Sequence, residues 1–372
     1  MQNSLRLLPF GPDRIGEQHV RRSPGAYMAI LLDACKWNRS ALDKTLYQGR
    51  KTMALADIHT SFSGNPLDRA DQLRTDAEIF GAYMQQDNAR VVLLAGESKQ
   101  ANGEARVSLL GESRILTDAA GDIAWQPVSR CKFLPVSTTI FLGLADGAPR
   151  YGVMLDGSAD DFADLFENEN AKFRDGRGIA FKLGEPHPSL GIIAQAKSML
   201  LWHESHRYCA KCGEESTLIK AGYERKCEAC GAHHFPRTDP VVIMLVRCGD
   251  KALVGRGHGW PEGHYSALAG FLEPGESIEE AVAREIFEEV GLKANKVTYM
   301  ASQPWPWPST LMIGAEAWVD EGELTIDAKE IDDAIWITKE DVRASIRGEH
   351  KYRLAPPPFA IASDLIKAWL QE

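Results

Sequence analysis

The sequence lacks the features that mark membrane, secreted and repetitive proteins. No apolar run approaches the roughly 20 residues that a membrane-spanning helix needs. The chain also shows no repeat of fixed period and no low-complexity segment. Its N-terminus, MQNSLRLLPFGPDRIG, has no apolar signal-peptide region, and its C-terminus, AWLQE, has no lipidation or peroxisomal signal. We therefore expect a cytoplasmic protein.

Positive charge is scarcer than negative charge. The 42 Lys and Arg residues are outnumbered by 52 Asp and Glu residues, which gives a formal net charge of −10. This balance argues against broad electrostatic binding of nucleic acid or of an anionic membrane, but it leaves room for a local basic nucleotide pocket. With 372 residues, 44% of them apolar and 25% charged, the chain has the composition of an ordinary globular protein with two or three domains.

Cysteine is sparse, and four of the seven cysteines fall in one short segment. Residues 209–230 read CAKCGEESTLIKAGYERKCEAC, in which fourteen residues separate two C-x2-C pairs. Four thiolates complete a tetrahedral zinc ion and leave no open position, so the pattern predicts a structural zinc site. The predicted ligands are Cys209, Cys212, Cys227 and Cys230. The alternatives are two disulfides or a redox pair, which the cytoplasmic signals and the paired spacing disfavour.

The other cysteines and the basic residues of this segment carry weaker signals. The scattered Cys35, Cys131 and Cys248 are interpreted as ordinary small core or surface residues. A zinc ribbon can also bind nucleic acid, although the acidic balance of the chain weakens that interpretation here. The basic residues that keep it open are Lys211, Lys220, Arg225 and Lys226.

An acidic stretch at 270–292, GFLEPGESIEEAVAREIFEEVGL, gives the strongest functional signal. Ser277 and Glu280 predict a capping box at the start of a helix, and Gly291 predicts a left-handed cap at its end. At about 100° per residue, the helix has one apolar stripe. Its members are Ile278, Ala281, Val282 and Ile286.

Glu285 and Glu289 lie four residues apart and project into that stripe instead of away from it. Carboxylates turned toward the protein are unfavourable unless a positive group meets them. Arg284 can neutralise one of them, and Glu276 is its expected partner. The others suit hard divalent cations such as Mg²⁺ or Mn²⁺, which activate water and neutralise phosphate charge during hydrolysis at phosphorus. The alternative is a solvent-exposed helix whose charged residues pair with residues four positions away. The direction of Glu285 and Glu289 into the apolar stripe and the two predicted helix caps argue against it.

Apolar and turn-forming segments predict the fold of the first half. We expect strands at 89–95, 107–110, 138–144 and 151–155, separated by turn-rich stretches at 96–105, 118–122 and 145–150. An acidic helix is expected at 160–170 and an amphipathic helix at 190–203. This half shows no catalytic constellation. Its histidines at the end, His187, His203 and His206, are interpreted as structural or solvent-facing.

The second half alternates strands and helices. After a short linker at 234–239, Pro240 opens a strong strand at 241–246. Further strands are expected at 317–319 and 334–337, with two helices, the acidic one and one at 359–370. This mixture predicts an α/β fold of the α/β/α-sandwich type.

A second informative stretch, SQPWPWPST at 302–310, alternates three prolines with two tryptophans. Proline at these positions precludes a regular helix or a central strand. A stiff loop with large apolar faces can bury a flat ring, and Gln303 and Ser309 can add polar contacts. The alternative is a structural loop that closes the core.

The acidic stretch resembles the box of the Nudix hydrolases, G-x5-E-x7-R-E-U-x-E-E-x-G-U with U apolar, at every fixed position. The matching residues are Gly270, Glu276, Arg284, Glu285, Ile286, Glu288, Glu289, Gly291 and Leu292. Nudix hydrolases cleave the diphosphate bond of a nucleoside diphosphate linked to a moiety X. The box implies this reaction class but does not identify X.

The proline-tryptophan stretch resembles S-Q-P-W-P-F-P-x-S of the NADH pyrophosphatase (NAD diphosphatase) subfamily, over about residues 190–360 of the chain. Trp307 replaces Phe and Thr310 replaces Ser, and both changes keep the chemical type. The resemblance implies three parts: an N-terminal α/β (Nudix-like) domain at 1–200, a zinc ribbon at 204–238, and a catalytic Nudix domain at 239–372.

The resemblance also implies roles for single residues. Metal ions would be held by Glu285, Glu289, Glu330 and the carbonyl of Ala269, with Glu276, Arg284 and Glu288 completing the catalytic box. Phe271 matches the residue that stacks on adenine, and Ala362 matches one that lines the nucleotide site. The substrate loop comprises Gln303, Pro304, Trp305, Pro306, Trp307, Pro308 and Ser309.

The implied reaction uses about two to three Mg²⁺ or Mn²⁺ ions to bring water to one phosphorus of NAD(H), giving AMP and nicotinamide mononucleotide. The general base stays open between a carboxylate, Glu289 or Glu288, and a metal hydroxide. Rival substrates are the NAD cap of RNA, ADP-ribose and other dinucleotides. A non-catalytic nucleotide sensor is the rival from another class. The resemblance implies a homodimer.

Overall fold

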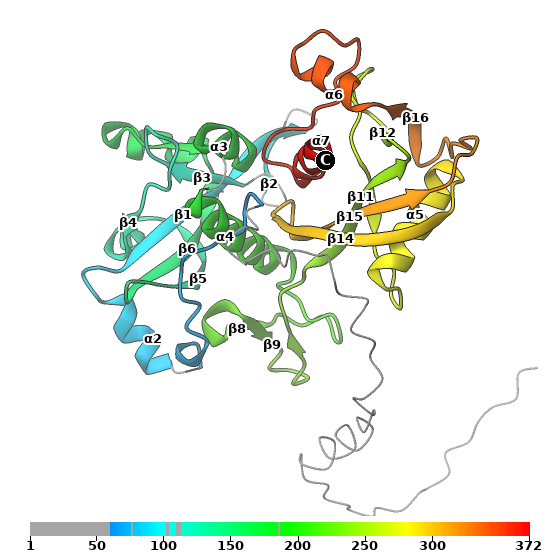
Figure 1. The fold of residues 1–372 in the computed structure, drawn as a ribbon. Coiled ribbons are helices and arrows are strands. Elements are labelled where there is room, and N and C mark those ends of the chain that lie inside the picture. Colours follow the sequence, from blue (N-terminus) through cyan, green and yellow to red (C-terminus); the bar gives the residue numbers. More distant parts are fainter. Residues whose placement is uncertain (1–59, 76, 102–103, 109–112, 185–186) are drawn as a thin grey trace, which may run out of the picture. The chain divides into compact units, whose positions relative to one another are not determined.

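The computed structural model describes residues 60–75, 77–101, 104–108, 113–184 and 187–372, all within one compact unit of the chain (Figure 1). The N-terminal stretch, Cys35 and the end of the expected strand at 107–110 lie outside these residues. Among the described helices, none is long and apolar enough to cross a membrane.

The first domain is built on one mixed sheet in the order β5-β6-β1-β3-β7, with β2 and β4 also paired to β1. Its strands are β1 (Arg90–Ala101), β2 (Glu104–Ser108), β3 (Arg114–Thr117), β4 (Gln126–Pro127), β5 (Val136–Ala145), β6 (Ala148–Ser158) and β7 (Lys172–Arg174). Val92 and Leu94 of β1 join one core cluster, while Val91 and Leu93 join another on the opposite face. Both faces are buried, which explains why the sequence here is continuously apolar.

The expected strands at 89–95, 138–144 and 151–155 are confirmed. The turn expected at 96–105 is wrong, because β1 continues to Ala101 and pairs with β2 from Glu97↔Ser108 to Ala101↔Glu104. Polar residues can form this pair of strands, β1 and β2, because the hydrogen bonds between strands use only backbone donors and acceptors. The acidic segment forms the 3₁₀-helix η5 (Asp160–Glu169).

Helices α2 (Ala77–Met84), α3 (Gly176–Leu183) and α4 (Pro188–Ser205) complete this domain, with short 3₁₀ turns η3 (Asp71–Leu73) and η4 (Val128–Phe133). The expected helix at 190–203 is present, but its expected amphipathic character is wrong. α4 is buried almost all around because it packs on β5 and β6 and also on β14 of the last domain. His187 caps its start, and His203 is buried near its end.

A small three-stranded sheet follows, in the order β10-β9-β8. It comprises β8 (Thr217–Ile219), the turn η6 (Lys220–Gly222), β9 (Glu224–Lys226) and β10 (His233–His234). Of the four clustered cysteines, two precede β8 and two lie between β9 and β10, so the group falls between the two larger domains of the sequence.

The last domain has a six-stranded sheet in the order β14-β15-β11-β12-β16, with β13 paired to β11. Its elements are β11 (Asp239–Cys248), β12 (Lys251–Gly257), β13 (Leu268–Phe271), α5 (Ile278–Val290), β14 (Ala294–Trp305), β15 (Thr310–Val319), β16 (Ile331–Ile337), α6 (Lys339–Ile346) and α7 (Ile361–Gln371). Val242 and Met244 of β11 pack in one core cluster with α5, whereas Ile243 and Leu245 pack in another with α7. Figure 1 shows these two helices on opposite sides of the sheet. The expected α/β/α sandwich is therefore confirmed.

Two expectations for this domain fail. The expected pair of helices omits α6, which begins at a capping box formed by Thr338 and Asp341. The loop expected at 302–310 is instead half strand, since β14 continues through Trp305 with Pro304 opposite Leu311. β14 is an edge strand, where a residue without an N–H group is tolerated.

Candidate active site

The acidic helix α5 is fixed at both ends as the sequence predicts. The Ser277 hydroxyl accepts a hydrogen bond from the Glu280 N–H at 3.2 Å, and the Glu280 carboxylate accepts one from the Ser277 N–H at 2.7 Å. Gly291 closes the helix in the left-handed region at φ 73°. Ile286 and Val282 of its apolar stripe are fully buried, and each such side chain contributes about 1.5–3 kcal/mol. These contacts fix the rotation of the helix and hence the direction of its glutamates.

Glu289 is the most deeply buried of these glutamates. Only 7% of its surface is exposed, and its Oε2 atom has no hydrogen-bond partner among the described residues. Burial, together with smaller effects of the nearby charges of Glu285, Glu330 and Glu288, raises the pKa of Glu289 to about 8. The same burial, with smaller effects from Glu288 and Glu330, raises the pKa of Glu285. Four carboxylates therefore act on one another electrostatically at one place.

Glu285 lies directly over the strand β13. A Cβ atom placed on Gly270 would come within 1.9 Å of the Glu285 carboxyl carbon. Gly270 pairs with Val242 in the sheet, so the strand cannot withdraw to make room. The glycine is required here for the close approach of a carboxylate and not for a special backbone angle.

Arg284, in the middle of α5, binds one acidic residue before the helix and two within its second half. Its Nε and Nη2 atoms donate to the two carboxylate oxygens of Glu276 at 2.6 and 2.9 Å, the pairing expected from the sequence. Its Nη1 donates to Glu285 at 2.8 Å and to Glu288 at 2.9 Å. Its bonds, helped by the Glu273 N–H, lower the pKa of Glu276 to about 2. Arg284 thus keeps Glu276 ionised and orients two further carboxylates.

The carboxylates suit divalent cations by their chemistry. The Glu289 carboxylate has a raised pKa and a buried oxygen without a hydrogen-bond partner in the part of the chain that the structure describes. Both features are expected of a carboxylate that binds a cation when that cation is absent. Arg284 neutralises Glu276 mainly, which leaves Glu289 and the exposed Glu330 without an ion-pair partner among the described residues. The chemistry of the site therefore fits hard divalent cations better than a single organic cation.

A cavity of about 720 Å³ opens beside these residues. Of the residues singled out in the sequence, it is lined by Ala269, Glu289, Gln303, Trp305, Glu330 and Ala362. The residues that do not line it are Phe271, Glu276, Arg284, Glu285, Glu288, Pro304, Pro306, Trp307, Pro308 and Ser309. The Phe271 ring is 62% exposed, outside this cavity. Two carboxylates, Glu289 and Glu330, and one of the two tryptophans, Trp305, therefore line the same cavity.

Gln303 lies in the wall of the cavity with its amide fully engaged. Its Nε2 donates to the Phe359 carbonyl at 2.9 Å and to the Ser61 carbonyl at 3.1 Å, and its Oε1 accepts from the Ile361 N–H at 2.8 Å. Ala360 cannot cap α7 with its own side chain, so Gln303 satisfies a free N–H at the start of that helix. The polar atoms of Gln303 thus hold three segments of the cavity wall together through Ser61, Phe359 and Ile361.

The sequence did not point to several residues of the cavity. They are Arg177, Trp260, Tyr265, Arg353 and Phe359. The aromatic and proline residues of 259–265 and 352–359 resemble those of the 302–310 stretch and could have been a signal. Arg177 comes from α3 of the first domain, and nothing in its local sequence indicates this position.

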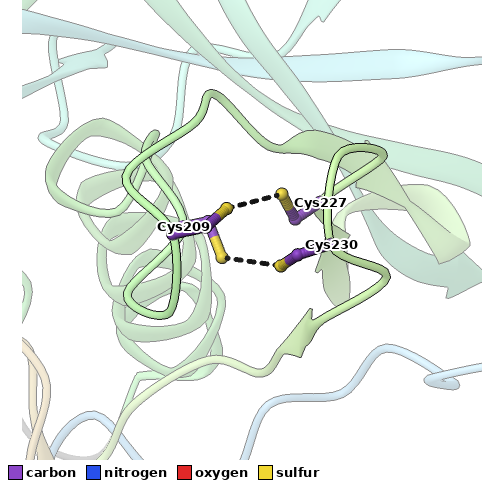
Figure 2. A group of neighbouring side chains, drawn as sticks. Cys209, Cys227 and Cys230 are labelled. Carbon is purple, nitrogen blue, oxygen red and sulfur yellow. Dashed lines mark hydrogen bonds between the residues drawn. The ribbon is translucent and has the colours of Figure 1, made fainter.

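The four cysteines converge as predicted. The Sγ atoms of Cys209 and Cys230 lie 3.6 Å apart, and those of Cys212 and Cys227 lie 3.5 Å apart. Figure 2 shows Cys209 on one loop facing Cys227 and Cys230 on another. Tetrahedral zinc with bonds of about 2.3 Å separates its sulfur ligands by about 3.8 Å, which these distances approach. Among the described residues, this is the only group of three or more such ligand atoms that all lie within 4.8 Å of one another.

The histidine next to this ribbon is structural. The His203 ring bonds the Gly222 carbonyl at 2.8 Å through Nε2 and contacts Arg225 at 3.1 Å through Nδ1. Burial lowers the pKa of His203 to about 4, so the ring is neutral at physiological pH. It connects α4 to the zinc ribbon and takes no part in the carboxylate site.

Comparisons with known families and proteins agree with this layout. The NADH pyrophosphatase-like rudimentary NUDIX domain matches residues 84–202, the NADH pyrophosphatase zinc ribbon domain matches 204–235, and the NUDIX domain matches 236–356. The NAD-capped RNA hydrolase NudC of Mycobacterium bovis is 35% identical over 310 residues, which cover 81% of this chain and 92% of that protein.

Two animal relatives match a shorter part of the chain. The NAD-capped RNA hydrolase NUDT12 of Homo sapiens is 45% identical over 192 residues, which cover 49% of this chain and only 42% of that protein. The mitochondrial NAD(P)H pyrophosphatase NUDT13 of Mus musculus is 40% identical over 207 residues, which cover 52% of this chain and 58% of that protein. The chain thus spans less than half the length of its human relative.

Proposed function

Because the chain belongs to the Nudix hydrolase family, in the NADH pyrophosphatase branch with a zinc ribbon, we propose that it hydrolyses the diphosphate bond of NAD(H) to AMP and nicotinamide mononucleotide. The observation that carries the proposal is the single cavity lined by Glu289, Glu330 and Trp305. A dinucleotide offers both a charged diphosphate and flat rings, and this cavity offers both kinds of partner.

The proposed cofactors are Mg²⁺ or Mn²⁺ at the carboxylates and one structural zinc ion at the four cysteines. Glu285, Glu289, Glu330 and the Ala269 carbonyl would hold the divalent cations. When bound, these cations supply an activated water and neutralise charge on the diphosphate. Since Glu289 is mostly uncharged below about pH 8 without a cation, binding must release its proton.

The chain's own residues bind and orient the substrate. Trp305 stacks on Phe359 with ring centroids 6.0 Å apart and an interplanar angle of 19°, so it presents a fixed apolar wall to the cavity. Glu276 and Arg284 hold Glu285 and Glu288 in place from outside the cavity. We further propose that Phe271, exposed at the end of β13, closes on a substrate ring only when the substrate is bound.

Removal of the NAD cap from RNA is a second proposed activity. The relatives in Mycobacterium bovis and in humans carry that activity in their names. Arg353 lines the cavity and has no side-chain ion pair or hydrogen bond among the described residues. A free guanidinium at this position suits the phosphate that follows the cap. We also propose a homodimer in the cytoplasm with the domains 1–200, 204–238 and 239–372.

The test compares NADH, NAD⁺, ADP-ribose and an NAD-capped RNA, each with Mg²⁺ and with Mn²⁺, by resolving the products and ranking kcat/KM. AMP and nicotinamide mononucleotide from NADH support the proposal. Arg353→Ala should lower kcat/KM for the capped RNA more than for NADH, by about tenfold for one lost phosphate contact. Cleavage of ADP-ribose alone would keep the reaction class and reject the dinucleotide. Tight binding without cleavage would favour the nucleotide sensor.

A further inference from the structure

Lys197 is a buried charged residue in the middle of α4, far in sequence from the carboxylate site. None of its surface is exposed. Its Nζ donates to the Pro306 carbonyl at 2.9 Å and lies 5.5 Å from the centre of the Trp307 ring. A buried ammonium group is unfavourable unless it is hydrogen-bonded. The hydrogen bond from Lys197 therefore favours the observed position of the Pro306 carbonyl. One of the partners of Lys197 is thus the turn between β14 and β15, in the other large domain.

Trp307 fits into a socket on the first domain, formed by Phe62, Gly176 and Arg177. Its ring meets Phe62 edge-on at 5.3 Å and lies under the Arg177 guanidinium at 4.7 Å. A Cβ atom on Gly176 would come within 3.1 Å of the Trp307 ring. The socket thus holds the ring so closely that a methyl group at Gly176 would push the ring by a few tenths of an ångström.

The strand that leads into this turn is bound to the first domain as well. The Thr60 hydroxyl donates to the Ser302 carbonyl at 2.8 Å, and Gln303 donates to the Ser61 carbonyl. β14 is the edge of its sheet, and the prolines of the turn provide no N–H groups to hold it. The turn therefore depends on donors from outside, and Lys197 supplies one.

The two tryptophans of this hairpin both touch the first domain but differ in what else they meet. Trp305, at the end of β14, meets Phe62 edge-on at 6.1 Å and also lines the cavity together with Glu289, whereas Trp307 does not line it. Their ring centroids are 4.8 Å apart, so a shift of Trp307 moves the surface against which Trp305 packs. Arg177 holds Trp307 from one side and also lines the cavity itself.

We propose that Lys197 is a positioning residue for substrate binding, through which the rudimentary Nudix domain holds the Trp305 wall of the catalytic cavity. The inference rests on the proposed function and assigns the first domain a part in it. Lys197 touches neither the carboxylates nor the cavity, so its removal should weaken dinucleotide binding and leave the chemical step largely intact.

The test is Lys197→Met in the full-length chain, with NADH as substrate. We expect KM to rise at least about tenfold and kcat to change by less than about threefold. Lys182→Met is the control for the loss of a lysine that bonds a backbone carbonyl, because the Nζ of the exposed Lys182 donates to the Ala119 carbonyl at 2.6 Å, away from the turn. The control should keep the KM of the wild type.

Gly176→Ala is the second variant, in case Lys197→Met does not fold. Alanine suits a helix, so the fold is kept, while the added methyl group displaces Trp307. We expect a raised KM with an unchanged melting temperature. A wild-type KM in both variants overturns the inference. If Lys197→Met does not fold, a wild-type KM in Gly176→Ala overturns it. Wild-type protein that does not cleave NADH overturns the proposed function instead, and the inference with it.

Discussion

Glu289 is the residue whose chemistry depends most on its surroundings. Its buried Oε2 has no partner among the described residues, and its pKa is raised to about 8. We predict that Glu289→Gln lowers kcat for NADH by about 100-fold or more, because a neutral amide cannot hold a cation or a proton as a carboxylate does. Steady-state hydrolysis measures this. Glu279→Gln, at an exposed position of the same helix, is the control and should retain full activity.

The same residue makes stability depend on pH when no divalent cation is added. Its pKa rises from 4.5 in the unfolded chain to about 8 in the fold, so the folded state binds the proton more tightly. This stabilisation is complete below pH 4.5 and is lost as the pH rises toward 8. We predict that urea unfolding shows wild type losing stability relative to Glu289→Gln between pH 5 and 8, by up to a few kcal/mol. Identical pH profiles of the two proteins would contradict the raised pKa.

The hairpin of β14 and β15 shows most clearly how one element can have two functions. Trp305 lines the cavity, whereas Trp307 is held in the socket of the first domain. We predict that Trp305→Ala raises KM for NADH by about tenfold or more, since stacking of a base on an aromatic ring contributes about 1–3 kcal/mol. Trp307→Phe should change KM by much less, because a smaller ring still occupies the socket.

Trp318→Ala controls for the general loss of a tryptophan from this sheet. Trp318 lies on β15 and packs on Arg247, which does not line the cavity. Its removal should lower stability without raising KM. If Trp305→Ala and Trp318→Ala gave the same KM, the substrate role of Trp305 would be wrong.

At the level of elements, the sequence predicted best where one local pattern determines the structure. The caps of α5 and its inward-facing glutamates follow from residue spacing alone. The capping box of α6 does not match the usual sequence pattern, because Asp341 occupies the position where Glu or Gln is usual. The exposure of α4 was predicted wrongly, since its burial depends on packing against a second domain.

At the level of the whole molecule, the zinc ribbon lies between the two larger domains in the sequence and contacts α4 through His203 and Arg225. We predict one zinc ion per chain, measured by elemental analysis. We also predict that Cys227→Ser lowers the melting temperature by roughly 5 °C or more, because folding of the ribbon is coupled to metal binding. Cys131→Ser, outside the cluster, should change it little. A zinc-free wild-type protein of equal stability would contradict this role.

The composition of the cavity could not be predicted from the sequence, because its lining comes from segments far apart in the chain. Arg177, Trp260 and Phe359 meet Glu289 only after both large domains fold. The reaction class depends on α5, which is local, whereas the shape of the substrate cavity depends on contacts between domains. This difference explains why the sequence predicts the carboxylates but not the contribution of α3 to the cavity.

The most direct test of the account is the hydrolysis of NADH with Mg²⁺ in water enriched in ¹⁸O, followed by mass spectrometry of the products. We predict AMP and nicotinamide mononucleotide, with one ¹⁸O atom on the phosphate of one of them, and about 100-fold slower formation of both products by Glu289→Gln. NADH that stays intact, or cleavage to nicotinamide and ADP-ribose without ¹⁸O on phosphorus, would contradict hydrolysis of the diphosphate bond at this site.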